Sequence, residues 1–207
     1  MIYTTNFSKF GCKAKSLIPQ ILTVLMFSVP LFNLKAQNNN TFTIFAGYTG
    51  SFNSEEHHYT TSYGGMTSLA FDMPVYKGLS FMPEAGFDFR AVDAVHGYEM
   101  QWLFVLRASV AYTFKLPKVN LSLLTGPRMN LSLANTEVMF VGGYRADYNR
   151  ISAGWQFGLG ITYKRMVFRG TFALPLSDYS HYYYEGGKGY KVNMYEVSVG
   201  YCFSASR

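Results

Sequence analysis

Eight ionisable side chains stand at alternating positions in segments whose intervening residues are apolar. They are four carboxylic acids and four arginines: Asp72, Glu84, Asp88, Arg90, Arg107, Arg128, Arg169 and Glu196. If the segments are β-strands, this alternation puts all of them on one face of a sheet. Buried charge is costly unless it is paired, and guanidinium groups match carboxylates in a bidentate geometry. The sequence therefore predicts a buried ionic network, with Glu84 and Arg107 as the best single pair. A narrow polar path through the same residues is the functional alternative.

Histidine and tyrosine gather between these segments. The candidate contact residues for a protein or glycan partner are His57, His58, Tyr179, His181, Tyr182, Tyr183 and Tyr184. Tyrosine offers rigid amphipathic contact area, although the same run is also expected in an aromatic rim at the level of lipopolysaccharide. The adjacent pair His57 and His58, without cysteine or His-x-x-x-His spacing, is a weak metal signal. No metal site and no cofactor is therefore predicted.

One short stretch contains residue types that hydrolytic enzymes use. Ser177, Asp178, Ser180 and His181 lie close in sequence, but proximity along a loop does not establish a nucleophile, a base and an orienting group. The sequence contains no Gly-x-Ser-x-Gly, P-loop or Cys-x-x-Cys motif. We therefore expect no catalytic residues, and a lipid-modifying enzyme remains an alternative.

The elements that must position these residues are strands. The clearest alternation runs over residues 151–163, where one set of positions is mainly apolar and aromatic and the other is glycine, serine, threonine and glutamine. Such a period of two is typical of a half-buried strand. Similar alternation predicts eight strands, at residues 41–50, 65–76, 79–91, 100–115, 119–133, 151–163, 166–176 and 191–203.

The connections between these strands alternate in length. Residues 51–64, 92–99, 134–150 and 177–190 form long connections, whereas the turns near residues 77, 117 and 164 are short. An up-and-down meander with its short turns at one end has this order, as outer-membrane barrels do. In a bilayer an open sheet edge would leave backbone groups unpaired, so the strands are expected to close into an antiparallel all-β barrel.

Alternation alone does not decide which face is outside, but three observations favour an apolar exterior in contact with lipid. The lysines that follow residue 36 lie in turns, loops or strand ends, and glycines recur on the polar face. Aromatic residues gather near strand ends, where interfacial girdles are found; examples are Tyr48, Tyr76, Phe89, Trp102, Phe114, Tyr163 and Phe203. A soluble lipocalin-like carrier, with the faces inverted, is the alternative.

The N-terminal segment has the pattern of a cleaved secretory signal peptide. Residues 1–36 contain Lys9, Lys13 and Lys15 before an apolar run over residues 17–32, and no acidic residue. This predicts a signal peptide at 1–36 and a barrel domain at 37–207. Without the leader, 14 basic and 12 acidic residues remain, a net charge of +2. So small a charge gives no reason to expect a nucleic-acid partner.

The exported leader, the eight strands, the asymmetric connections and the final aromatic strand over residues 195–203 together resemble a known group. The chain is similar to the small eight-stranded outer-membrane barrels of Gram-negative bacteria, of the OmpA/OmpX type, in the porin-family group of outer-membrane β-barrel domains. One departure is that Ser204, Ala205, Ser206 and Arg207 follow Phe203, whereas such chains usually end on the aromatic residue.

The resemblance implies a location in the outer membrane, with lipid and lipopolysaccharide around the barrel and the barrel-assembly machinery as a partner during insertion. We expect a non-enzymatic barrel with a plugged polar lumen and a structural, adhesive or accessory role carried by its external loops. The alternatives are a narrow porin-like channel for small solutes, a lipid-modifying enzyme and a lipocalin-like carrier.

Overall fold

The computed structural model describes residues 40–53, 61–94, 97–133, 137–140, 144–182 and 189–204. The predicted signal peptide and the side chains of His57, His58, Tyr183 and Tyr184 lie outside the described residues. For His181 and Tyr182 the backbone alone is described.

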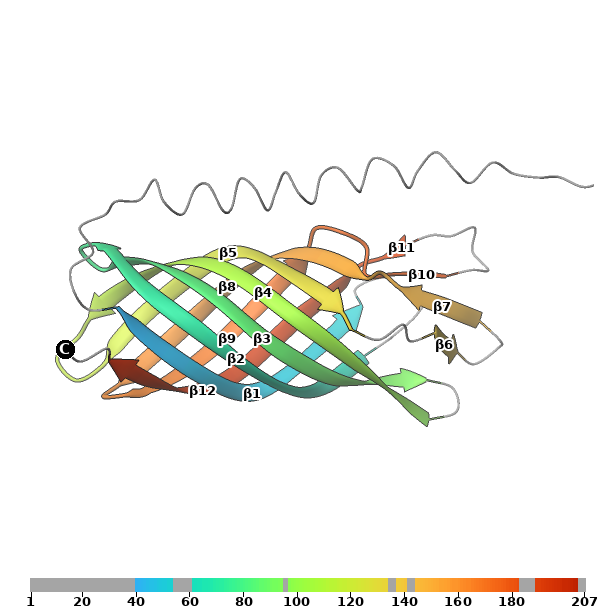
Figure 1. Ribbon diagram of the computed structural model, residues 1–207, viewed down its shortest axis with the longest axis horizontal. Helices are drawn as coiled ribbons and strands as arrows, with labels where there is room; N and C mark the ends of the chain where they lie inside the picture. Colours follow the sequence, from blue (N-terminus) through green and yellow to red (C-terminus); the bar gives the residue numbers. More distant parts are fainter. Residues whose placement is uncertain are drawn as a thin grey trace, which may run out of the picture. The chain divides into compact units, whose positions relative to one another are not determined.

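Eight long antiparallel strands close into a barrel (Figure 1). They are β1 (Thr41–Asn53), β2 (Thr61–Tyr76), β3 (Leu79–Ala94), β4 (Gly97–Lys115), β5 (Asn120–Ser132), β8 (Ile151–Tyr163), β9 (Met166–Pro175) and β12 (Val192–Ser204). Their order around the barrel is β1-β12-β9-β8-β5-β4-β3-β2. The first strand pairs with the last, from Thr41 opposite Ser204 to Asn53 opposite Val192, so the barrel wall has no open edge. The predicted all-β barrel of eight strands is thus confirmed.

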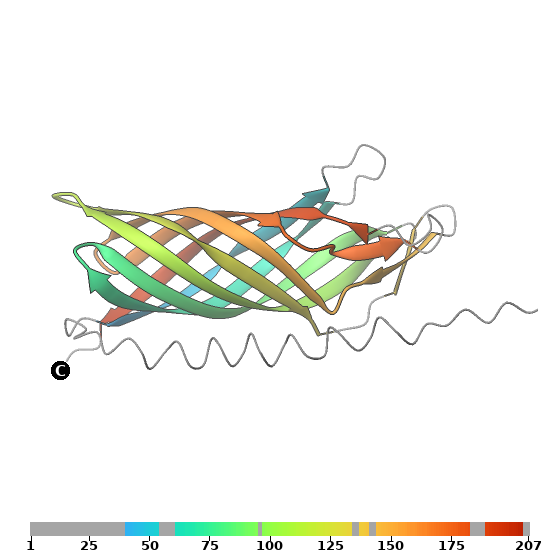
Figure 2. The ribbon, with the colours of Figure 1, turned by 90° about the horizontal axis from the view of Figure 1, so that it is seen from above.

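The three tight turns lie at one end of the barrel, which we call the short-turn end (Figure 2). Lys77 and Gly78, between β2 and β3, both have positive φ, at 26° and 90°, and Lys164 between β8 and β9 has φ of 55°. Positive φ in two-residue hairpin turns matches the twist of the flanking strands. The opposite end, which we call the long-loop end, carries the longer connections.

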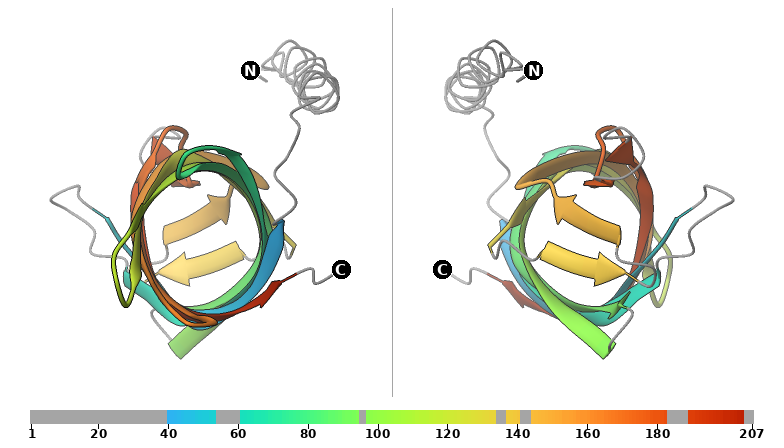
Figure 3. Two further views of the ribbon diagram at one scale, coloured as in Figure 1. Left: turned by 90° about the vertical axis from the view of Figure 1, so that its left-hand side faces the viewer. Right: turned by 90° about the vertical axis from the view of Figure 1, so that its right-hand side faces the viewer.

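A second, smaller sheet at the long-loop end was not expected from the sequence. It consists of β6 (Glu137–Phe140), β7 (Tyr144–Tyr148), β10 (Ser180–Tyr182) and β11 (Gly189–Tyr190), in the order β11-β10-β7-β6. Figure 3 shows β6 and β7 lying across the mouth of the barrel. Asn149 joins the two long connections, because its backbone N donates to Tyr179 O at 2.9 Å and its Nδ2 to Asp178 O at 2.8 Å. Strands this short show too few alternations to be recognised in a sequence.

The outer face of the barrel is apolar, as predicted. Along β8 the exposed positions are the apolar and aromatic ones, such as Leu159 at 56% exposed, whereas Gln156 is 1% exposed. Outward aromatic rings pack on their neighbours in adjacent strands, as Phe42 does on Phe203 with ring centroids 4.8 Å apart. Within the described residues no helix is long and apolar enough to span a bilayer. Because the apolar side chains lie on the outer face, the lipocalin-like alternative, which needs them inside, is wrong.

Candidate functional site in the barrel lumen

Five strands bring seven of the eight predicted charged residues together inside the barrel. Glu84, Asp88 and Arg90 come from β3, Arg107 from β4, Arg128 from β5, Arg169 from β9 and Glu196 from β12. Each is at most 4% exposed. Because an eight-stranded barrel is narrow, long side chains from opposite walls meet at its axis. We call these seven residues the ionic cluster.

Glu84 is held from three sides. Its Oε1 accepts from Arg107 Nη1 at 2.5 Å and from Ser68 Oγ at 2.5 Å. Arg169 reaches both carboxylate oxygens, with Nη1 at 2.6 Å from Oε2 and Nη2 at 2.8 Å from Oε1, the bidentate geometry that favours arginine over lysine. The pair that the sequence singled out, Glu84 and Arg107, is therefore in contact within a larger arrangement.

The other two carboxylates link the remaining arginines. Glu196 Oε1 accepts from Arg107 Nη2 and Arg128 Nη1, each at 2.5 Å. Asp88 Oδ2 accepts from Arg90 Nη2 at 2.7 Å and from Arg128 Nη2 at 2.9 Å. Arg107 thus bridges Glu84 to Glu196, and Arg128 bridges Glu196 to Asp88. The result is one continuous chain of charge-assisted hydrogen bonds across the lumen.

Asp72 stands outside this cluster, which corrects the prediction that it belongs to the network. It lies near the short-turn end of β2, is only partly buried, and its side chain hydrogen-bonds Ser80. No ion pair of Asp72 occurs among the described residues. The cluster consequently contains four arginines and three carboxylates, one positive charge in excess, where the sequence suggested equal numbers.

The short-turn side of the cluster is closed by an aromatic ring. Phe45 on β1 is 2% exposed and faces inward among mostly polar or small positions. The guanidinium carbon of Arg169 lies 3.8 Å from the centroid of the Phe45 ring, a cation–π contact. Phe45 therefore shields the Arg169 and Glu84 pair from the open end of the barrel.

Tyr179 closes the other side. It follows β9, is 7% exposed, and its hydroxyl donates to Gln101 Oε1 on β4. Burial raises the pKa of Tyr179 above its ordinary value of 10.0, so the phenol stays protonated. The sequence placed Tyr179 among external contact residues; the structure corrects this, because the side chain is buried over the lumen.

The segment that carries Tyr179 is tied to β8. The backbone N atoms of Leu176 and Ser177 donate to Ala153 O at 2.9 and 3.1 Å, and Ala153 N donates to Ser177 Oγ at 2.8 Å. We call residues 176–179 the strap. Ser177, which the sequence grouped with Asp178 and His181 as types used in hydrolysis, thus accepts a backbone hydrogen bond that anchors the strap.

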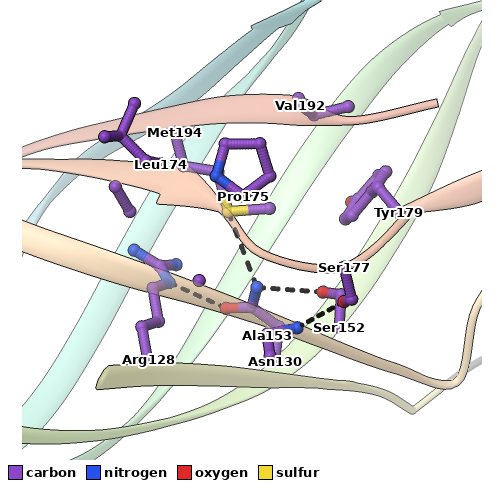
Figure 4. A pocket seen from close by; sticks show the side chains of 12 residues that line it. Arg128, Asn130, Ser152, Ala153, Leu174, Pro175, Ser177, Tyr179, Val192 and Met194 are labelled. Atoms are coloured by element: carbon purple, nitrogen blue, oxygen red, sulfur yellow. Dashed lines mark hydrogen bonds between the residues drawn. The ribbon is translucent and has the colours of Figure 1, made fainter.

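A small cavity of about 10 Å³ lies beside the cluster at this level (Figure 4). Arg128, Asn130, Ser152, Tyr179 and Met194 are among its lining residues. Asn130 accepts from Arg128 Nε at 2.8 Å and donates to Ser152 Oγ at 3.1 Å. A cavity of this size admits about one water-sized species.

Sequence reasoning missed three of the residues that close the lumen. Gln101 and Gln156 stand on the polar face by simple alternation, and the latter donates to Ser109 Oγ at 2.7 Å. Alternation alone could have found both. Phe45 is an aromatic residue on that same face, an exception that the sequence pattern does not explain. Among the described residues, no group of three or more histidine, cysteine or acidic side chains is arranged to hold a metal ion.

No family model and no curated protein matches the sequence. Among solved structures, Neisserial surface protein A is similar, with a TM-score of 0.52 and 16% identity over 79% of this chain and 95% of that one. Ail of Yersinia pestis gives a TM-score of 0.46 and 12% identity, over 79% of this chain and 99% of that one. OprG of Pseudomonas aeruginosa gives 0.47 and 12%, over 83% and 99%.

At these identities the likeness concerns the fold. The similarity to Neisserial surface protein A shows that the chain has the architecture of the small outer-membrane barrels. That architecture and the apolar outer face agree with the predicted location in the outer membrane of a Gram-negative bacterium.

Proposed function

We propose that this protein is a non-enzymatic outer-membrane barrel. Its lumen is closed by side chains with a structural role, and its long-loop end makes the functional contacts. The role is structural or adhesive, with a protein or glycan at the cell surface as partner. The observation that carries the proposal is the closed lumen: the ionic cluster joins strands on opposite sides of the wall, and Phe45 and Tyr179 cover its two sides.

The small sheet at the long-loop end supports a role in contact. Four short strands, β6, β7, β10 and β11, order two long connections that lie beyond the barrel wall. An ordered sheet loses less conformational entropy on binding than a flexible loop does, which favours its use as a recognition surface. Lipid and lipopolysaccharide are the expected surroundings of the barrel itself.

The first test is conductance of the purified full chain in a planar lipid bilayer. We expect no steady single-channel current, because every arginine of the cluster is engaged with a carboxylate. A steady current that changes in Arg107→Ala would contradict the plug and support the narrow-channel alternative.

The second test concerns the long-loop end. Cells that display the full chain are compared with cells displaying a variant in which residues 137–148 are replaced by a glycine–serine segment of equal length. We expect cell-to-cell aggregation and retention on polystyrene to fall in the variant, while unboiled electrophoresis shows that its barrel is still folded. Equal aggregation and retention in the two strains would refute the adhesive role.

A further inference from the structure

The side of the ionic cluster nearest the long-loop end has more hydrogen-bond donors than acceptors. Arg90 is fully buried; its Nη2 donates to Asp88, but its Nε and Nη1 have no hydrogen-bond partner among the described residues. Gln101 stands directly opposite in the β3–β4 ladder and is 1% exposed, and in the part of the chain that the structure describes its Nε2 also has no hydrogen-bond partner. Gln101 Oε1 is already engaged by Tyr179. Two facing residues thus present three buried nitrogen donors.

The described side chains around Arg90 carry less negative charge than positive charge. Three carboxylates serve four arginines, and the carboxylates of Glu84 and Glu196 are occupied by Arg107, Arg128 and Arg169. Arg90 shares a single oxygen of Asp88 with Arg128. Among the described side chains, Tyr179 is a further acidic group that interacts with Arg90, and its protonated phenol supplies no charge. A buried charge without compensation destabilises the folded state, so the arrangement calls for an anion.

We propose that a small monovalent anion binds between Arg90 and Gln101, beneath Tyr179, and neutralises the ionic cluster. The ligand class is a halide or a carboxylate of the size of formate, because the donors are few and the small cavity lined by Tyr179 and Arg128 takes about one water-sized species. A water molecule would satisfy the donors but would leave the excess charge. The proposal does not depend on the proposed adhesive role.

The test measures how anions change thermal unfolding of the full chain. The protein is refolded in detergent in sodium chloride, sodium formate or sodium gluconate at equal ionic strength, and the compact fraction is followed by unboiled electrophoresis against temperature. Binding to the folded state alone raises the midpoint in a saturable way, by about 5 °C at roughly 100-fold the dissociation constant.

The anion arms identify the ligand. A higher unfolding midpoint in chloride alone identifies the ligand as a halide, and one in formate alone identifies it as a small carboxylate. A higher midpoint in both salts shows that the site selects anions by charge and size. Gluconate is too large for the space and serves as the reference. Equal midpoints in all three salts would overturn the proposal.

A pair of variants locates the site. Arg90→Met removes the excess charge and two of the donors, so its midpoint should no longer respond to the anion. Arg165→Met removes an exposed arginine at the short-turn end, where its Nη1 donates to Tyr201 Oη at 3.2 Å, and should respond as the wild type does. An undiminished response in Arg90→Met would place the anion elsewhere and refute this site.

Crystals of the wild-type chain grown in sodium bromide give a test that needs no variant. An anomalous peak within hydrogen-bond distance of Arg90 Nε or Nη1 is expected for a halide site. For a carboxylate-selective site, formate density at the same nitrogens is expected from crystals grown in sodium formate. Ordered water alone at those nitrogens in both crystals would refute the proposal.

Discussion

The middle of the lumen and its short-turn end are built from the same strands but are filled in different ways. In the middle, long charged side chains cross the axis and each guanidinium is bound to a carboxylate. At the short-turn end the inward residues are short and polar, as in the pair Thr113 and Ser122, whose hydroxyl groups lie 2.8 Å apart. These two residues are partly exposed, whereas the residues of the cluster are buried.

The difference shows that buried charge in this barrel is concentrated in the middle of the lumen. A short hydroxyl side chain forms its hydrogen bonds with a neighbour or with water, and it is too short to cross the lumen. An arginine reaches across the lumen and ties strands that are far apart in sequence, as Arg128 on β5 does to Glu196 on β12. Mutations in the middle should therefore cost far more than mutations at the short-turn end, with those of the strap between them.

The largest effect is expected for Arg107→Met. Arg107 is the one residue of the cluster that binds both Glu84 and Glu196, each at 2.5 Å, so its loss leaves two buried carboxylates short of a partner. The free energy of unfolding should fall by about 3–5 kcal/mol. Denaturant titration of the detergent-solubilised barrel, followed by electrophoretic mobility, measures it. A loss under about 1 kcal/mol would mean that the cluster contributes little to stability.

An intermediate effect is expected for Tyr179→Phe, which keeps the ring over the lumen but removes the hydrogen bond to Gln101. The loss should be about 1 kcal/mol at neutral pH. Because burial raises the pKa of Tyr179, the folded chain holds this proton more tightly than the unfolded chain does. The resulting stability is present below about pH 10 and is lost as the pH rises through the folded-state pKa.

The advantage of the wild type over Tyr179→Phe should therefore shrink in alkaline solution, as measured by the same titration repeated between pH 7 and pH 11. The difference between the two proteins cancels the ionisation of the other tyrosines. A difference that stays constant across this range would show that Tyr179 is not buried over the lumen.

The smallest effect is expected for Asp72→Asn. Asp72 has no ion pair among the described residues, and asparagine retains an oxygen that accepts from Ser80. The free energy of unfolding should change by no more than about 0.5 kcal/mol. A loss close to that of Arg107→Met would place Asp72 in the cluster and remove the contrast between the two parts of the lumen.

Much of this architecture follows from local pattern. Residues 151–163 alternate so regularly that both the strand and its two faces could be predicted, and β8 has those bounds. The turn at Lys77 and Gly78 and the end of β2 at Tyr76 could be predicted from the sequence in the same way. By contrast, β6, β7, β10 and β11 are each too short for a period to show, and they form a sheet only because two separate long connections meet.

The fold class, the strands and the face on which each charged residue stands all follow from period-two alternation, because that pattern is a property of neighbouring residues. Which of the charges meet depends on the three-dimensional arrangement of the strands. The register and tilt of closed strands set the depth of each side chain, and depth separates Asp72 from the cluster while bringing Glu196 on β12 to Arg107 on β4. The burial of Tyr179 and the excess positive charge around Arg90 are consequences of that depth.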